Sequence, residues 1–152
     1  TYPWPEMRLS DLYLLYAETI NEVQGPVAEA FTYLNMIRER AGIPTVQEAW
    51  SLYSTNPTAY TTKEGLRNII HRERGIELAL EGSRLWDLKR WKTALNVLNA
   101  PITGWTLDQP SAAGYYQLRT VFVQRFSSRD YFWSIRTTAI EINRNLEQNP
   151  GW

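Results

Sequence analysis

ERGIELALEGSRLWDLKRW, residues 73–91, is the stretch that decides how this chain folds. It places Glu73, Glu77 and Glu81 at helical i, i+4 and i+8 spacing, so three carboxylates lie along one side of a helix. Uncompensated neighbours of like charge repel by about 0.2–0.5 kcal/mol per pair. Apolar residues stand between the charges, and buried charge is tolerated only when it is paired and hydrogen-bonded. The stretch therefore predicts a helix–turn–helix with a buried ionic seam, which is scaffold and not an active site.

The arginines nearest to these glutamates in the sequence, Arg74, Arg84 and Arg90, are their predicted partners. Asp87 is expected to form a cap or a salt bridge to Arg84 or Arg90. The weaker alternative for Asp87 is a hard-cation site, in which its carboxylate and backbone oxygens would hold a structural Ca²⁺. No other cofactor is expected. The predicted ion-pair network comprises Glu73, Arg74, Glu77, Glu81, Arg84, Asp87 and Arg90.

Apolar residues recur at three- and four-residue steps before this stretch and predict a first helix pair over residues 8–44. The first helix covers about residues 8–23 and ends at Gly25-Pro26. The second follows Pro26, a residue tolerated in the first turn, and stops at Gly42 and Pro44. Two short antiparallel helices over roughly 35 residues match a tetratricopeptide-like unit.

A second helix pair is predicted over residues 62–99. Thr61, with Glu64 three residues later, offers a capping box for its first helix, which Gly82-Ser83 breaks. A continuous second helix then covers about residues 84–98. Between the two pairs, a short helical turn around residues 47–53 is compatible with the sequence. The apolar face of the first of these helices comprises Leu66, Ile69, Ile70, Ile76 and Leu80.

Residues 100–152 differ in character, because Gly and Pro interrupt a polar stretch dotted with aromatic residues. Alternating residues predict an extended segment over 121–126, and a last helical turn is expected over 138–143. We expect this tail to wrap the helices and not to form a separate domain. The predicted fold is therefore a single all-α domain over residues 1–152, with tetratricopeptide-like stacked hairpins and an irregular C-terminal tail.

Composition excludes several functions. Sixteen basic and sixteen acidic residues give zero formal charge, which lacks the electrostatic footprint of a nucleic-acid binder. Cysteine is absent, so this portion has no disulfide, thiolate nucleophile or thiolate metal site. His71 is the one histidine and cannot make a multi-histidine metal site, while Ser83 is better explained as a helix cap than as a nucleophile. The chain starts at Thr1 and not at a methionine, so we expect it to be part of a longer protein.

The glutamates could instead act as general acid and base in glycoside hydrolysis. Neighbours one turn apart on a single helix rarely bracket a substrate, and nearby arginines lower carboxyl pKa values, which is wrong for a general acid. The structural interpretation is therefore favoured. The remaining functional candidates are aromatic rings in loops, which can stack on sugars but more often pack or form interfaces. These candidate ligand-binding residues are Trp50, Tyr53, Tyr60, Trp105, Tyr115 and Tyr116.

Four blocks together resemble one known family. The helix pair ERGIELALEGSRLWDLKRW, MRLSDLYLLYAETINE at residues 7–22, LNMIRERAGIP at residues 34–44, and an ending in QNPGW at residues 148–152 are similar to segments of SusD/RagB-type outer-membrane nutrient-binding lipoproteins. The blocks occur in the family's order, cover about half of this chain, and resemble the C-terminal part of those longer proteins.

The resemblance implies a non-catalytic protein, lipid-anchored at the extracellular face of the outer membrane. It would bind an oligosaccharide or peptide above a SusC-like TonB-dependent transporter, and residues 1–152 would mainly be scaffold beside the protein's N-terminal part. Two alternatives remain at this level. One is a tetratricopeptide-like adaptor that binds a protein segment, and the other is a helical carbohydrate-processing enzyme that depends on Glu73 or Glu77.

Overall fold

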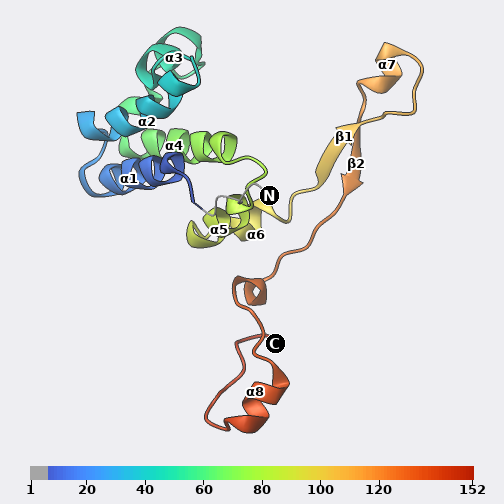
Figure 1. Ribbon diagram of the computed structural model, residues 1–152. Helices are drawn as coiled ribbons and strands as arrows, with labels where there is room; N and C mark the ends of the chain where they lie inside the picture. Colours follow the sequence, from blue (N-terminus) through green and yellow to red (C-terminus); the bar gives the residue numbers. More distant parts are fainter. Residues whose placement is uncertain (1–6) are drawn as a thin grey trace, which may run out of the picture. The chain divides into compact units, whose positions relative to one another are not determined.

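The computed structural model describes residues 7–152, which form helices and a two-stranded sheet (Figure 1). The predicted helical fold class is confirmed. The chain divides into two compact units, Thr1–Arg84 and Leu85–Trp152. The elements are α1 (Leu9–Gln24), α2 (Ala28–Arg40), α3 (Val46–Tyr53), the 3₁₀ turn η1 (Ala59–Thr61), α4 (Lys63–Glu77), α5 (Ser83–Arg90), α6 (Ala94–Val97), β1 (Ile102–Trp105), α7 (Ala112–Tyr115), β2 (Leu118–Phe122), the 3₁₀ turn η2 (Ser128–Tyr131) and α8 (Thr137–Ile142).

Three long helices build the first unit, because α1 packs against both α2 and α4 (Figure 1). Gly25 separates α1 from α2 at φ +82°, a conformation that glycine adopts without a steric penalty. Its N–H donates to the carbonyl of Asn21 and ends α1. The predicted first helix pair is thus present, with α1 within one residue of its expected bounds and α2 ending at Arg40, just before the predicted stop at Gly42 and Pro44. The core of the unit is formed by Leu14, Ala17, Ile20, Ala30, Phe31, Leu34, Ile37, Val46, Leu66, Ile69 and Ile70.

Hydroxyl caps start α3 and α4. Thr45 begins α3 in a capping box with Glu48, a feature not predicted from the sequence. For α4 the cap is Thr62, whose hydroxyl accepts from the N–H of Gly65 at 3.1 Å, so the predicted cap at Thr61 is wrong by one residue. Thr61 instead belongs to η1, which packs so closely on α4 that a Cβ at position 65 would lie 1.8 Å from a carbonyl oxygen of that turn.

The second predicted helix pair is shorter and more broken than expected. The first of its helices, α4, ends at Glu77, and Leu80 then takes φ +66° and is fully exposed. Ile76 is 63% exposed, so neither residue belongs to the buried apolar face predicted for them. The predicted continuous helix over residues 84–98 is also wrong. Lys92 takes φ +59° and separates α5 from α6, because a left-handed residue cannot continue a right-handed helix.

In the second unit, β1 and β2 form an antiparallel pair with Gly104 opposite Arg119 and Trp105 opposite Leu118. A Cβ at position 104 would meet the side chain of Val121 at 2.9 Å, so glycine permits this close approach. The extended segment predicted over residues 121–126 is therefore displaced towards the N-terminus, since β2 is Leu118–Phe122. The partner strand β1 was not predicted. The expected last helical turn is present as α8.

Side chains of the C-terminal residues tie the end of the chain back onto earlier backbone. Gln148 accepts from the N–H of Ile135 at 2.8 Å and donates to its carbonyl at 2.9 Å. The indole N–H of Trp152 donates to the carbonyl of Arg129 at 3.2 Å, and the guanidinium of Arg129 lies 4.7 Å from that ring. These contacts close a loop within the second unit. Wrapping of this tail around the first unit stays a prediction.

Replacement of Leu34 by Ala tests the core of the first unit. Leu34 is completely buried, so we expect the free energy of unfolding to fall by about 2–5 kcal/mol, measured by chemical denaturation. Leu52→Ala is the control, because Leu52 is 70% exposed and its loss should change stability by no more than about 0.5 kcal/mol. Equal effects of the two variants would contradict this assignment of the core.

Candidate functional site

The carboxylates of α4 that face α2 are paired with arginines of that helix. Glu73 accepts a hydrogen bond from Arg38, and both side chains are largely buried. Arg38 is itself held by the carbonyl of Pro44, to which its Nε donates at 2.7 Å. Glu77, one turn further along α4, pairs with Arg40. The two ion pairs therefore join α2 to α4.

Arg8 joins the start of α1 to the end of α4. Its Nε and Nη2 donate to the two carboxylate oxygens of Glu81 at 2.9 and 2.7 Å, a bidentate arrangement. Its Nη1 donates to the carboxylate of Glu77 at 2.8 Å, and Nη2 also donates to the Glu77 carbonyl at 2.8 Å. That carbonyl lies in the last turn of α4, where it lacks a partner within the helix. One guanidinium thus satisfies two acids and a helix terminus.

The remaining charges of α4 face α1 along its length. Arg74 is almost fully buried and donates to the carboxylate of Asp11 at 2.7 Å. Near the opposite end, Arg67 makes a bidentate pair with Glu22 at 2.5 and 2.6 Å. Pairs that involve the first residues of α1 use the last residues of α4 and vice versa, so the two helices are antiparallel. The seam of charge therefore fixes their relative register.

The three glutamates are paired with arginines, but these partners lie far away in the sequence. The arginines that pair with the three glutamates are 35 to 73 residues distant, and come from α2 and from the residue before α1. Arg74, the expected neighbour of Glu73, is rotated by about 100° around the helix axis and faces α1 instead. The seam consequently joins separate helices and is not confined to the hairpin of residues 73–91.

The pairing lowers the pKa of two carboxyl groups. Burial alone would raise the pKa of Glu77, but hydrogen bonds from Arg8 and Ser10 and the charge of Arg40 outweigh it, so the net shift is downwards. Hydrogen bonds from Arg67 lower the pKa of Glu22. Bonds to Glu81 and Glu77 correspondingly raise the pKa of Arg8. A carboxyl group with a lowered pKa is a poor general acid near neutral pH, so this geometry suits structure and not proton donation.

Three of the predicted ligand-binding aromatics lie in the first unit. Trp50 and Tyr60 are half-buried and pack against the core, and Tyr60 meets Phe31 edge to face with ring centroids 6.0 Å apart. Tyr53, one turn after Trp50 on α3, is 78% exposed. Trp50 and Tyr53 line the same pocket, whereas Tyr60 does not. The structure thus brings two of these three predicted residues to a common site.

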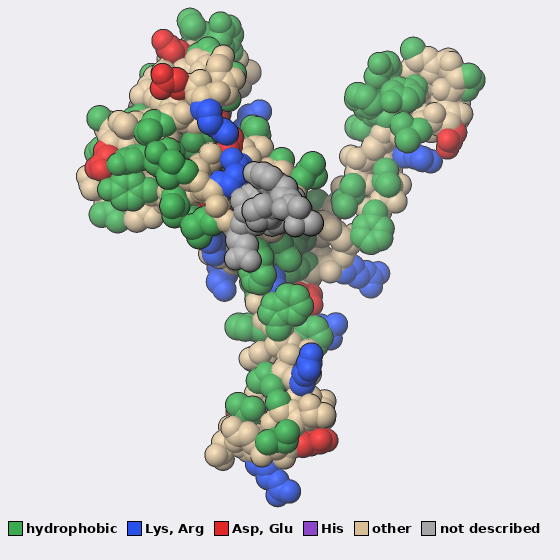
Figure 2. All heavy atoms as spheres, viewed as in Figure 1, with side chains coloured by type: hydrophobic (Ala, Val, Ile, Leu, Met, Phe, Trp, Pro, Cys, Tyr) green, Lys and Arg blue, Asp and Glu red, His purple; other side chains and the backbone are tan. Residues whose placement is uncertain are grey.

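The other three predicted aromatics gather in the second unit. Trp105 at the end of β1 packs against Tyr115 and Tyr116, with ring centroids 5.7 and 5.0 Å apart, and the two tyrosines are 5.1 Å apart. Figure 2 shows hydrophobic side chains gathered around α7, at the tip of the hairpin. The three rings pack against one another in tilted and edge-to-face contacts, and each ring still has exposed surface. This cluster is a compact aromatic tip and not an open row of rings.

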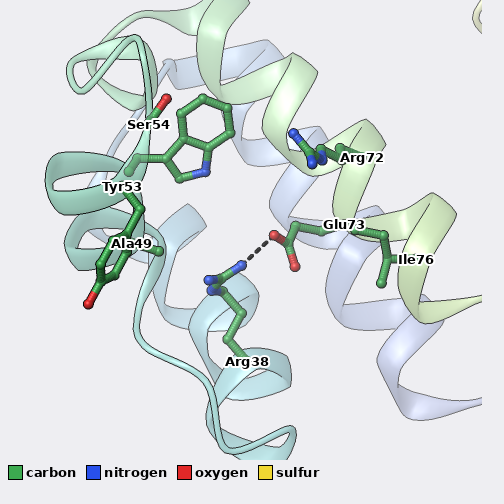
Figure 3. Close-up of a pocket in the computed structure, with 8 residues that line it drawn as sticks. Arg38, Ala49, Tyr53, Ser54, Arg72, Glu73 and Ile76 are labelled. Atoms are coloured by element: carbon green, nitrogen blue, oxygen red, sulfur yellow. Dashed lines mark hydrogen bonds and ion pairs between the residues drawn. The ribbon is translucent and has the colours of Figure 1, made fainter. Parts of the chain in front are cut away.

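The pocket that holds Trp50 and Tyr53 has a volume of about 320 Å³ and is shown in Figure 3. Arg72 and Glu73 extend into it from α4, and Arg38 approaches from α2 (Figure 3). Sequence reasoning missed Arg38 and Arg72 as pocket residues, since they come from α2 and α4 and only the fold brings them near the aromatic rings of α3. The full lining is Arg38, Ala49, Trp50, Tyr53, Ser54, Arg72, Glu73 and Ile76.

Metal and membrane signals are absent from the described part of the chain. Within residues 7–152, no three His, Asp or Glu side chains gather as a metal site requires. Asp87, the candidate calcium ligand, accepts a hydrogen bond from Nε of Arg90 at 2.9 Å, as expected of a salt bridge. Over the same residues, no helix combines the length and apolarity needed to cross a membrane.

Comparison with known proteins gives a family match over the whole chain and relatives that match most of it. Residues 1–152 match the SusD family. SusD-like protein P25 of Formosa agariphila is 43% identical over 60% of this chain, and SusD-like protein P38 of the same organism is 37% identical over 67% of it. Among solved structures, a SusD-like carbohydrate binding protein of Bacteroides fragilis is 30% identical over 93% of the chain, with a TM-score of 0.66. A second SusD-like protein of that organism is 28% identical over 98% of the chain, with a TM-score of 0.74.

This chain corresponds to a small part of each relative. The matched regions span 16% of P25 and 19% of P38. They span 28% and 26% of the two Bacteroides fragilis chains.

Removal of one charge from the seam should destabilise the first unit. We expect Glu77→Gln to lower the free energy of unfolding by about 1–3 kcal/mol, because Arg8 and Arg40 then lose a charged partner in a largely buried position. Thermal and chemical denaturation would measure the loss. Glu147→Gln is the matched control, since Glu147 is exposed and has no partner among the described residues. A Glu77 variant as stable as the control would contradict a structural role.

Stability should also depend on pH through these carboxyl groups. The folded-state pKa values of Glu77 and Glu22 lie below the usual 4.5, so in acid the unfolded chain binds more protons than the folded one. Their contribution is therefore fully present above about pH 4.5 and is lost as the pH falls through the lower, folded-state values. The denaturation midpoint of the unmodified protein should decline as the pH is lowered from about 6 to about 3. The midpoint of Glu22→Gln should decline less steeply. A flat profile for the unmodified protein would refute the linkage.

Proposed function

This chain belongs to the SusD family, and from that premise we propose that the protein binds carbohydrate at the cell surface as a step in nutrient uptake. The family match over all of residues 1–152 carries the proposal. A relative described as a carbohydrate binding protein, which is 30% identical over 93% of the chain, supports the ligand class. An oligosaccharide is therefore the proposed ligand in preference to a peptide.

The location and the partner form the finer part of the proposal. We place the protein at the extracellular face of the outer membrane, held there by a lipid anchor. A SusC-like TonB-dependent transporter would receive the captured ligand, so the protein itself would have no need of bond chemistry. The membership of the chain in the SusD family supports this arrangement.

The residues of the first unit support a scaffold role for α1, α2 and α4. Glu73, Glu77 and Glu81 are each engaged by arginine, and the helices pack on a continuous apolar core. Such side chains hold one geometry and supply no poised acid–base pair. The parts of the first unit able to meet a ligand are α3 and the exposed side of α4, where the pocket of Figure 3 lies.

Binding without turnover is the expected behaviour. Calorimetric titration of the complete protein with a panel of neutral and charged oligosaccharides should give saturable binding to at least one of them. Prolonged incubation with that ligand should leave its chain length unchanged when the mixture is analysed by chromatography. Release of shorter products would contradict the proposal, as would the absence of binding to every glycan in the panel.

A further inference from the structure

The pocket of Figure 3, formed by α2, α3 and α4, is the feature whose chemistry goes beyond scaffold. We infer that it binds an acidic sugar unit, with the anionic group on Arg72 and the sugar ring against the aromatic side chains of α3. This inference rests on the proposed carbohydrate-binding function and specifies the charge of the ligand.

Arg72 is the residue that sets the charge. It is exposed and lines the pocket, and within residues 7–152 its guanidinium has neither a hydrogen bond nor an ion pair. The neighbouring Glu73 does not neutralise it, because that carboxylate is bonded to Arg38. A guanidinium presents a planar fork of donors that matches a carboxylate or sulfate group. The pocket therefore offers an unoccupied cation at its edge.

The aromatic residues supply a surface for a sugar ring. Trp50 contributes to the wall of the pocket while it packs against the core, so its position is fixed. Tyr53 stands one helical turn later and is mostly exposed at the rim. Flat rings held by a rigid element present an apolar surface that suits the C–H face of a sugar, and the pocket also includes the hydroxyl of Ser54.

The Arg38–Glu73 pair forms a rigid polar wall beside this surface. Their side chains are only 10% and 14% exposed, and Arg38 is fixed further by its bond to Pro44. Carboxylate oxygens accept several hydrogen bonds, so Glu73 keeps acceptor capacity for a sugar hydroxyl. A volume of about 320 Å³ lies at the small end of ligand pockets, which suits a short segment of a glycan. A neutral sugar would leave Arg72 without an anion, so an acidic unit is the better match.

The test compares acidic with neutral oligosaccharides of equal length on the complete protein. The probes are an oligogalacturonate, a sulfated galactan oligosaccharide and a neutral galactan oligosaccharide, titrated by calorimetry at low and high salt. We expect at least one acidic probe to bind more tightly than the neutral one. Arg72→Gln should weaken that binding about tenfold or more, while binding of the neutral probe stays unchanged. The affinity of Arg72→Lys for the acidic probe should fall between those of the unmodified protein and Arg72→Gln. Lysine keeps the positive charge but lacks the planar set of donors that a guanidinium presents.

Arg144→Gln is the matched control, because Arg144 is exposed, lies outside the pocket and has no partner among the described residues. It should bind every probe as the unmodified protein does. The two acidic probes show whether the anion is a carboxylate or a sulfate.

Three outcomes would overturn the inference. These are equal affinity for acidic and neutral probes, an acidic preference that survives Arg72→Gln, or an equal loss in the Arg144 variant. In each of these cases the wider proposal would stand, because glycans still bind. Failure of every glycan to bind would remove both proposals together.

Discussion

The ionic seam between α1 and α4 is the constraint on which the first unit depends. Arg8 meets Glu77 and Glu81 at one end, and Arg67 meets Glu22 at the other. Charges withdrawn from water are costly unless each finds an opposite charge in good geometry. A shift of one helix past the other would separate these pairs at once. The seam thus selects a single register, while the apolar core beneath supplies most of the stability.

The arginines of α4 differ in their partners, and this difference distinguishes structural residues from the proposed ligand-binding residue. Arg67 and Arg74 face α1 and form ion pairs with its carboxylates. Arg72 turns towards α3 and meets no anion among the described residues. Because 3.6 residues complete a turn, residues two positions apart, such as Arg72 and Arg74, lie on nearly opposite sides of one helix. A single helix therefore holds the scaffold together on one side and exposes a binding group on another.

Several features followed correctly from local sequence. The periodicity of residues 8–44 predicted α1 and α2 closely, and the C-terminal helical turn was also expected. Errors arose where local signals competed. Thr61 and Thr62 are both good caps, and only the packing of η1 on Gly65 selects Thr62. Likewise, an unbroken apolar pattern concealed the left-handed residue at Lys92 that divides α5 from α6.

The sequence by itself determined the helical class, the family resemblance and the need for the acids of residues 73–91 to be neutralised. These depend on spacing of three or four residues along one chain, which a pattern records directly. Only the tertiary structure decided which arginines neutralise them and that Arg72 shares a pocket with Trp50. Such contacts join helices far apart in the sequence, and their distances follow from how apolar faces pack, which no local pattern specifies.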